Sequence, residues 1–167
     1  LGDFNRGTLG QPSFEWQGQR IAPNICYEDL FGEELAARFF DPAQAPTVLV
    51  NFSNIGWFGN TLAVDQHLQI SRMRALELER PMVRATNTGA TVIIDHRGVV
   101  THALERFSRG VLRGEVHGRG LGVSGDAGIT PFAWWASRWG LWPLWLLAGL
   151  GVAAGWLGRR RRTQAQA

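Results

Sequence analysis

The chain has 167 residues, 45% of them hydrophobic, and a formal net charge of +3. This length suffices for roughly one domain with a real core. Its single cysteine excludes an internal disulfide. All 17 basic residues are arginine, so this chain alone cannot complete a mechanism that needs a lysine. The chain opens on Leu1, within a polar, glycine-bearing stretch, and we expect it to be the C-terminal part of a longer protein.

The first half of the chain predicts alternating strands and helices. Residues 20–26 form a short strand, and residues 31–40 a helix that Asp41-Pro42 ends. The β-rich run at 47–53 predicts a buried strand, and a glycine-punctuated loop follows at 54–60. Residues 65–79 carry apolar side chains at helical spacing, so we expect an amphipathic helix with Asp65 as a candidate cap.

After Pro81, three more strands are predicted, over residues 82–86, 90–95 and 111–116. Turn sequences at 87–89 and 96–98 come directly after the first two of these strands, which favours antiparallel pairing at that edge of the sheet. The order of elements predicts a layered α/β sandwich of which part of the sheet is missing.

The composition changes sharply near Pro131. Six of the eight tryptophans lie between Trp134 and Trp156, and residues 139–157 are 19 residues without a charge, followed by four arginines at 159–162. That pattern predicts one transmembrane helix with an aromatic belt at its start and its basic end in the cytoplasm. A buried core helix is disfavoured, because such helices rarely run so long while apolar on every face. The four arginines could also form a solvated tail or a nucleic-acid patch, but neither explains why they abut the apolar run.

If the arginines stay in the cytoplasm, the preceding residues lie across the membrane, in the periplasm of a bacterium. Without those four arginines, the net charge of the chain is −1, and no basic face for nucleic acid is evident. The four histidines have no metal-ligand spacing with one another or with the cysteine, and we interpret them as structural or solvent-facing. We therefore expect neither a metal nor a cofactor.

Cys26 is the candidate nucleophile. It is the last residue of the strand predicted at 20–26, within the sequence NICYED, and open α/β folds gather their chemistry at such strand ends. A lone cysteine at a strand end is by itself more often a core residue than a catalyst. A catalytic thiol also needs a base or a cation nearby, because the thiolate is the reactive form.

Four motifs occur in order along the chain: NICYED, NFSNIGWFGN, DQHLQISRMRALELERPMVRATNTGAT and VIIDHRG. Together with the terminal apolar segment, this set resembles the C-terminal part of the apolipoprotein N-acyltransferase family, membrane-bound enzymes of the nitrilase, or carbon-nitrogen hydrolase, superfamily. The resemblance implies the C-terminal part of a nitrilase-like α-β-β-α sandwich over residues 1–130, one transmembrane helix over 131–158, and a basic cytoplasmic tail over 159–167.

The resemblance also implies a two-step acyl transfer. Cys26 matches the cysteine of a Glu-Lys-Cys triad, which takes a fatty acyl group from a phospholipid as a thioester. The acyl group then passes to the diacylglyceryl-cysteine amine of an apolipoprotein. Tyr27 would supply an oxyanion-binding N–H, and Glu28 and Trp57 would lie near the site. The glutamate and lysine of the triad lie upstream in the family, so we expect this chain alone to be inactive, and the whole protein to reside in the bacterial inner membrane.

Two alternatives stay open. A membrane-tethered carbon-nitrogen hydrolase acting on an amide or nitrile would share the cysteine strand, but it would not require the final span or the aromatic belt. A non-catalytic, membrane-anchored interaction domain would keep the fold without the triad.

Overall fold

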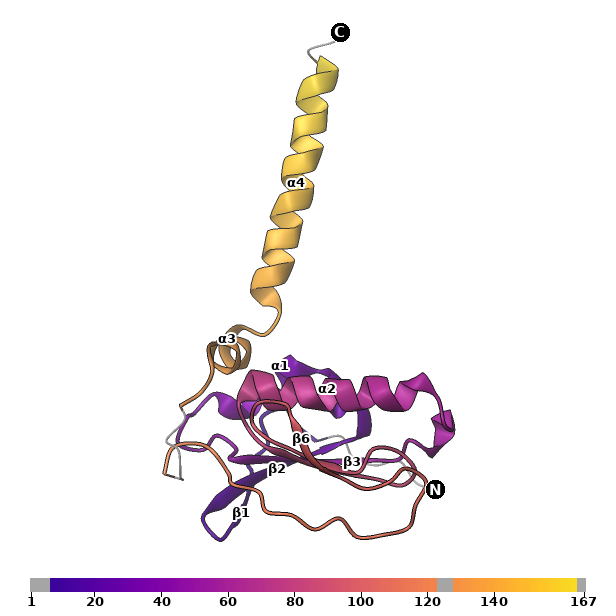
Figure 1. The fold of residues 1–167 in the computed structure, drawn as a ribbon. Helices are drawn as coiled ribbons and strands as arrows, with labels where there is room; N and C mark the ends of the chain where they lie inside the picture. The colour runs from indigo at the N-terminus through magenta and orange to yellow at the C-terminus, as the bar shows by residue number, and fades with distance from the viewer. Residues whose placement is uncertain (1–6, 123–127, 165–167) are drawn as a thin grey trace.

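The computed structural model describes residues 7–122 and 128–164, with side chains up to residue 159. Its centre is a six-stranded sheet in which the strands follow the chain order, and the sheet lies below α1 and α2 in Figure 1. The strands are β1 (Phe14–Trp16), β2 (Gln19–Ile25), β3 (Val48–Ser53), β4 (Met82–Thr86), β5 (Val92–Ile94) and β6 (Val100–Ala103). The predicted strand at 82–86 is confirmed to the residue, and the one at 47–53 begins one residue later than predicted.

The sheet is parallel in its middle and antiparallel at both edges. β2, β3 and β4 run parallel, so their carboxyl ends meet at one edge of the sheet. β4, β5 and β6 pair antiparallel, which confirms the predicted pairing at that side. β1 was not predicted. It forms a hairpin with β2 through Gln17 and Gly18, which both have positive φ, as a two-residue type I′ turn requires.

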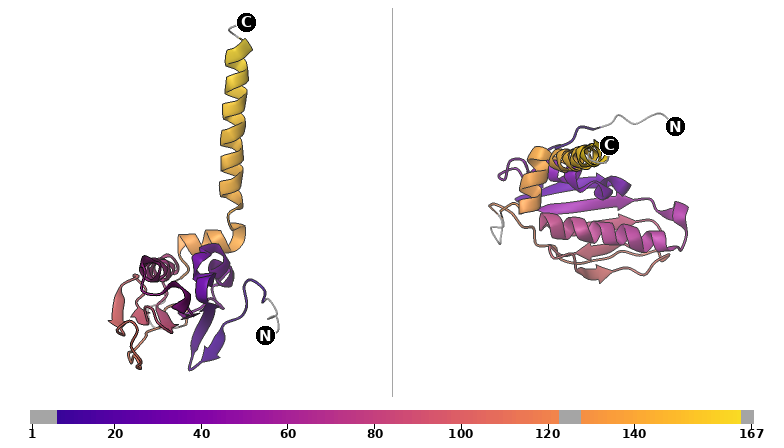
Figure 2. Two further views of the ribbon diagram at one scale, coloured as in Figure 1. Left: turned by 90° about the vertical axis from the view of Figure 1, so that its right-hand side faces the viewer. Right: turned by 90° about the horizontal axis from the view of Figure 1, so that it is seen from above.

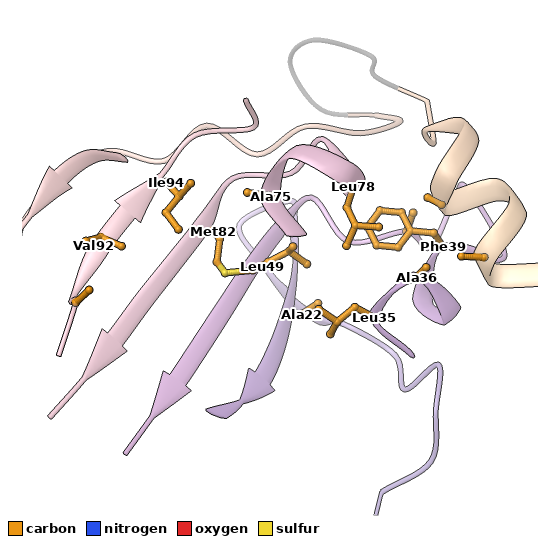
Figure 3. Close-up of a cluster of buried hydrophobic side chains, with 14 of the residues drawn as sticks. Ala22, Leu35, Ala36, Phe39, Leu49, Ala75, Leu78, Met82, Val92 and Ile94 are labelled. Carbon is orange, nitrogen blue, oxygen red and sulfur yellow. The ribbon is translucent and has the colours of Figure 1, made fainter. Parts of the chain in front are cut away.

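Helices cover one face of this sheet (Figures 1 and 2). The main ones are α1 (Gly32–Ala36), which continues into the 3-10 turn η2 (Ala37–Phe39), and α2 (Leu62–Leu78). The buried core lies between these helices and the sheet (Figure 3). It includes Ala22, Leu35, Ala36, Phe39, Leu49, Ala75, Leu78, Met82, Val92 and Ile94.

The other face of the sheet is apolar but incompletely covered. Side chains alternate between the two faces along a strand, so Ile25 and Phe52, which are register partners, point away from the helices. They are 65% and 52% exposed. Phe14 and Trp16 at the β1 edge share this face through their pairing with β2, and both are exposed as well. This face therefore carries large apolar side chains of the kind that are normally buried in a protein core.

Two expectations from the sequence are wrong. Residues 111–116 are not a strand; the sixth strand is β6, which follows the Gly98 turn directly and pairs with β5. Asp65 does not cap α2, because the helix begins three residues earlier, after Thr61, and Asp65 pairs with Arg106. In addition, the predicted helix at 31–40 is a short α-helix followed by a 3-10 turn.

The predicted membrane segment is divided into two helices, α3 (Pro131–Trp139) and α4 (Trp142–Gln164). Gly140, at φ 51°, ends α3 in a conformation that favours glycine. Among the described residues, neither helix alone is long and apolar enough to qualify as a membrane span. Taken together, α3 and Trp142–Arg159 do reach that length and composition, with a bend of 77° between them.

The expected basic tail at 159–167 begins inside α4, since this helix continues to Gln164. Residues 165–167 lie outside the described residues. The predicted first domain, residues 1–130, likewise includes two segments outside them, 1–6 and 123–127.

Candidate active site

Cys26 lies at the carboxyl edge of the sheet, where β2 ends and the 3-10 turn η1 (Cys26–Leu30) begins. It is a free, half-buried thiol. Its φ is +52°, which is uncommon for a residue other than glycine. Such a conformation costs free energy and persists only where the surrounding contacts enforce it. A sharp strand-to-helix turn of this kind brings a nucleophile to the surface of a sheet.

Two side chains hold the backbone of this turn. The carbonyl oxygen of Cys26 accepts a hydrogen bond from Asn51 Nδ2 at 2.9 Å and lies 3.3 Å from His67 Nε2. Asn51 also donates to Asn24 Oδ1 at 2.5 Å and accepts from Ser53 Oγ at 2.5 Å. Asn24 and Asn51 are almost completely buried, at register-paired positions of β2 and β3. Their amides therefore fix the turn from within the protein.

A buried charged cluster lies beneath the turn. Asp29 is fully buried, with its Oδ1 3.0 Å from His67 Nε2. Ser71 Oγ donates to Asp29 Oδ2 at 2.5 Å, and Arg84 Nη1 lies 3.5 Å from that same oxygen. Arg84 Nη1 also donates to Ser71 Oγ. Burial lowers the pKa of the Arg84 guanidinium, and the Asp29 carboxylate opposes that shift.

Tyr27 connects the cysteine turn to this cluster. Its ring stacks on the His67 ring with centroids 4.5 Å apart and an interplanar angle of 13°. Phe58 meets the Tyr27 ring edge-on at 6.0 Å. These contacts hold the residue directly after Cys26, whose N–H was predicted to bind an oxyanion.

The Glu28 side chain has a capping role in the structure. Glu28 Oε2 accepts the backbone N–H of Ile25 at 2.6 Å and so closes the turn around the cysteine. Burial lowers the pKa of Arg38, and the charge of the nearby Glu28 opposes that shift. Glu28 is exposed, so it borders the turn without lying beneath it.

Trp57 lies in the loop after β3, within the 3-10 turn η3 (Gly56–Phe58), and its side chain is 83% exposed. The loop is tied to the segment after β4, because Asn87 Nδ2 donates to Asn54 Oδ1 at 2.7 Å. Asn87 Oδ1 also accepts the N–H of Ile55 at 3.1 Å. The loop thus stands at the same edge of the sheet as Cys26 and reaches it through Phe58 and Tyr27.

The buried cluster was not predicted from the sequence. No role was assigned to Asp29, Ser71 or Arg84, and His67 was interpreted as structural or solvent-facing. One signal was available: Arg84 stands two residues after Met82 in β4 and so shares the face of the strand that Met82 buries in the core. Among the described residues, no group of three or more His, Cys, Asp and Glu side chains could hold a metal ion.

Neither of the two described cavities includes Cys26. The first, of about 460 Å³, lies at the opposite edge of the sheet, between β5 and the segment 115–119. Chemistry is better located by the strained cysteine turn than by this cavity, since the buried side chains of Asn51 and His67 both reach the Cys26 carbonyl.

Sequence comparison relates most of the chain to one family. The family model for carbon-nitrogen hydrolases matches residues 3–120. An apolipoprotein N-acyltransferase from Verminephrobacter eiseniae is 77% identical over 141 residues, which are 84% of this chain and 26% of that protein. One from Ralstonia nicotianae is 51% identical over 165 residues, which are 99% of this chain and 29% of that protein. The chain thus spans less than a third of the length of these curated relatives.

Solved structures share the fold. The crystal structure of an amidase from Nesterenkonia sp. matches with a TM-score of 0.52 at 20% sequence identity, over 65% of this chain and 42% of that chain. A carbon-nitrogen hydrolase from Helicobacter pylori matches with a TM-score of 0.51 at 14% identity, over 60% and 41% of the two chains.

Proposed function

Because the chain belongs to the carbon-nitrogen hydrolase family, we propose that Cys26 is the nucleophile of an acyl transfer. The chain is homologous to part of the apolipoprotein N-acyltransferases. In this proposal it works as part of a longer protein that moves a fatty acyl group from a phospholipid to the N-terminal diacylglyceryl-cysteine of apolipoproteins. The observation that carries the proposal is the Cys26 turn, a strained strand end held by buried side chains.

The first step forms a thioester. The glutamate of the triad takes the proton of the Cys26 thiol, and the thiolate attacks the ester carbonyl carbon. The tetrahedral oxyanion then collapses, and the lysophospholipid leaves as an alcohol that carries the proton returned by the glutamate. The backbone N–H of Tyr27 is suited to bind the oxyanion, since stacking on His67 fixes this residue. In the second step the lipoprotein amine attacks the thioester and loses a proton, and the Cys26 thiolate leaves.

The proposed triad needs two residues from outside this chain. The chain contains no lysine, so in this proposal the lysine of the triad comes from the part of the relatives that the chain does not span. We assign the base glutamate to that same part, because the Glu28 carboxylate caps the turn. The chain alone is therefore inactive in this proposal.

The unpartnered face of the sheet supports the same arrangement. In an α-β-β-α sandwich, a second sheet would pack against the face that carries Phe14, Trp16, Ile25 and Phe52. Side chains of this size rarely form a continuous exposed surface in a soluble monomer. We assign residues 1–130 to this catalytic domain, with the second sheet supplied by the rest of the protein.

The C-terminal segment anchors the domain in a membrane. Leu144, Leu147, Leu150 and Val152 of α4 are all exposed, as expected of a helix whose solvent is lipid. In the proposal, residues 131–158 hold the domain at the bacterial inner membrane. The arginines at 159–162 and the rest of the tail to residue 167 lie in the cytoplasm, and the catalytic domain lies in the periplasm.

Intact mass spectrometry tests the proposed chemistry. The longest chain that the reading frame encodes would be incubated with phospholipid vesicles, and the present chain serves as the unreactive control. We expect a fatty-acyl mass gain on Cys26 that hydroxylamine removes. A folded protein without that gain, but able to hydrolyse small amides, would contradict acyl transfer and favour the amide hydrolase; activity on neither substrate would favour the non-catalytic domain.

Trp57 is expected to act in substrate binding. Replacing Trp57 by alanine removes a large apolar surface next to the site, so we expect the KM for phospholipid to rise by roughly three- to tenfold with a smaller loss of kcat. Trp57→Phe is the matched control, and it should retain most of the affinity. Steady-state kinetics with mixed micelles measure both constants. If Trp57→Ala lost as much activity as a Cys26 variant, the residue would instead shape the site or the fold.

A further inference from the structure

α3 is fixed to the catalytic domain. Its N-cap, Thr130, accepts the N–H of Ala133 at 3.0 Å, and the Thr130 hydroxyl donates to the carbonyl of Glu77 at the end of α2, at 2.6 Å. Ala133 and Ala136 are buried in the main core, 0% and 4% exposed. The position of α3 therefore follows that of the domain.

The outer side of α3 is aromatic and positively charged. Trp134 and Trp139 are 50% and 58% exposed. The Arg138 guanidinium lies over the Trp134 ring at 5.1 Å and over the Phe40 ring at 5.2 Å. It also donates to the carbonyl of Phe40 at 3.2 Å. The guanidinium is thereby held within an aromatic surface formed by α3 and by Phe40 at the end of η2.

α4 starts next to this surface. Only Gly140 and Leu141 separate it from α3, and the two helices are bent by 77° at this break. Both side views show α4 leaving the domain from its helix-covered side, at α3 (Figures 1 and 2). If residues Trp142–Arg159 enter a bilayer along its normal, α3 must lie close to the plane of the membrane surface, since a bend of 77° turns one helix across the axis of the other.

We propose that the outer side of α3, formed by Trp134, Arg138 and Trp139 and extended by Phe40 and Trp142, is a phospholipid-binding surface that seats the domain on the bilayer. This inference rests on the membrane anchoring by α4 in the proposed function. The helical layer of the domain then faces the membrane, and the sheet lies behind it.

The chemistry of this surface fits the headgroup region of a phospholipid bilayer. Tryptophan rings are preferred at the depth where headgroups meet acyl chains, because one side of the ring is apolar and the indole N–H is polar. An arginine at that depth can bind a lipid phosphate. Continuity with α4 makes lipid the natural occupant, because the surface borders the first turn of the helix that enters the bilayer.

This orientation of the domain on the bilayer also determines where Cys26 lies relative to the membrane surface. α3 is tied to the C-terminal end of α2, whereas the Trp57 loop precedes the N-terminal end of α2. A helix of 17 residues is about 25 Å long. With the helical layer against the bilayer, α2 separates two aromatic contacts, α3 at one end and Trp57 beside the cysteine edge at the other. The second contact is where a phospholipid ester would reach Cys26.

Depth-dependent fluorescence quenching tests the proposal on the longest chain in phosphatidylglycerol and phosphatidylethanolamine vesicles. Single-tryptophan variants retain Trp134, Trp139 or Trp145, with the other tryptophans replaced by phenylalanine; a variant that retains Trp16 is the control. Lipids brominated near the headgroup should quench Trp134 and Trp139 several-fold more than lipids brominated at mid-chain. Trp145 should show the reverse order, and Trp16 no quenching.

A second measurement needs no variant. A phospholipid with a photoactivatable headgroup, cross-linked to the unmodified protein, should label residues 131–142. Deep quenching of Trp145, with no lipid contact of Trp134 and Trp139 by either method, would overturn the proposal and assign this surface to a protein neighbour. Absence of quenching at Trp145 would instead remove the membrane anchor of the proposed function, and the seating with it.

Discussion

Replacing Cys26 by serine is expected to reduce acyl transfer by the longer protein by roughly three orders of magnitude or more. Serine has nearly the same size, so the turn that the Asn51 and His67 side chains hold should persist. A hydroxyl, however, ionises far less readily than a thiol and is a much weaker nucleophile in the same site. The measurement is kcat/KM for transfer from phospholipid to a diacylglyceryl-peptide in detergent micelles.

Asn60→Ala provides the control for this substitution. Asn60 is exposed in the loop at the same edge of the sheet, and no role in the site is assigned to it. Its replacement should leave the rate within a few-fold of the parent. If Cys26→Ser retained a tenth or more of the parental activity while folded, as judged by circular dichroism, Cys26 would be removed from the mechanism.

Replacing Asp29 by alanine is expected to lower the free energy of unfolding by about 3–5 kcal/mol. The substitution leaves the Arg84 guanidinium buried without its carboxylate and takes an acceptor away from Ser71 and His67. A buried charge without a partner is costly, because nothing in the interior replaces its water. Unfolding by denaturant in detergent, followed by circular dichroism, measures the loss.

Two further variants separate the buried pair from acidic residues in general. Asp65→Ala breaks an ion pair with Arg106 at an exposed position, and its effect should be small, since water screens that pair. Asp29→Leu combined with Arg84→Met removes both buried charges and should regain part of the lost stability. An Asp29→Ala protein as stable as the Asp65→Ala protein would show that the buried cluster does not stabilise the fold.

Local sequence patterns predicted the strands at the centre of the sheet well. β3 and β4 are short apolar runs bounded by turn residues, as predicted. The strand predicted at 20–26 is shifted by one residue, since β2 ends at Ile25 and Cys26 begins η1. The last strand was misplaced, because β6 is short and contains Thr101 and His102, so it lacks a clear apolar pattern. Its pairing with β5 across the Gly98 turn determines that it is a strand.

Local sequence patterns could not predict the buried charged cluster, for a different reason. Asp29, His67 and Arg84 come from a turn, a helix and a strand, and only the packing of these elements brings them together. Taken alone, each residue has an ordinary alternative role at the surface. The break at Gly140 was missed similarly, because a run of uncharged residues has the same composition whether it forms one helix or two.

The positive φ of Cys26 also limits which amino acids this position tolerates. A side chain that is branched at Cβ collides with its own backbone in the left-handed region, so threonine is disfavoured at this position although it carries a hydroxyl. Cysteine and serine have a single heavy atom on Cβ and are tolerated better. The backbone conformation thus restricts which nucleophilic side chains can replace Cys26 in the course of evolution, independently of how reactive those side chains are.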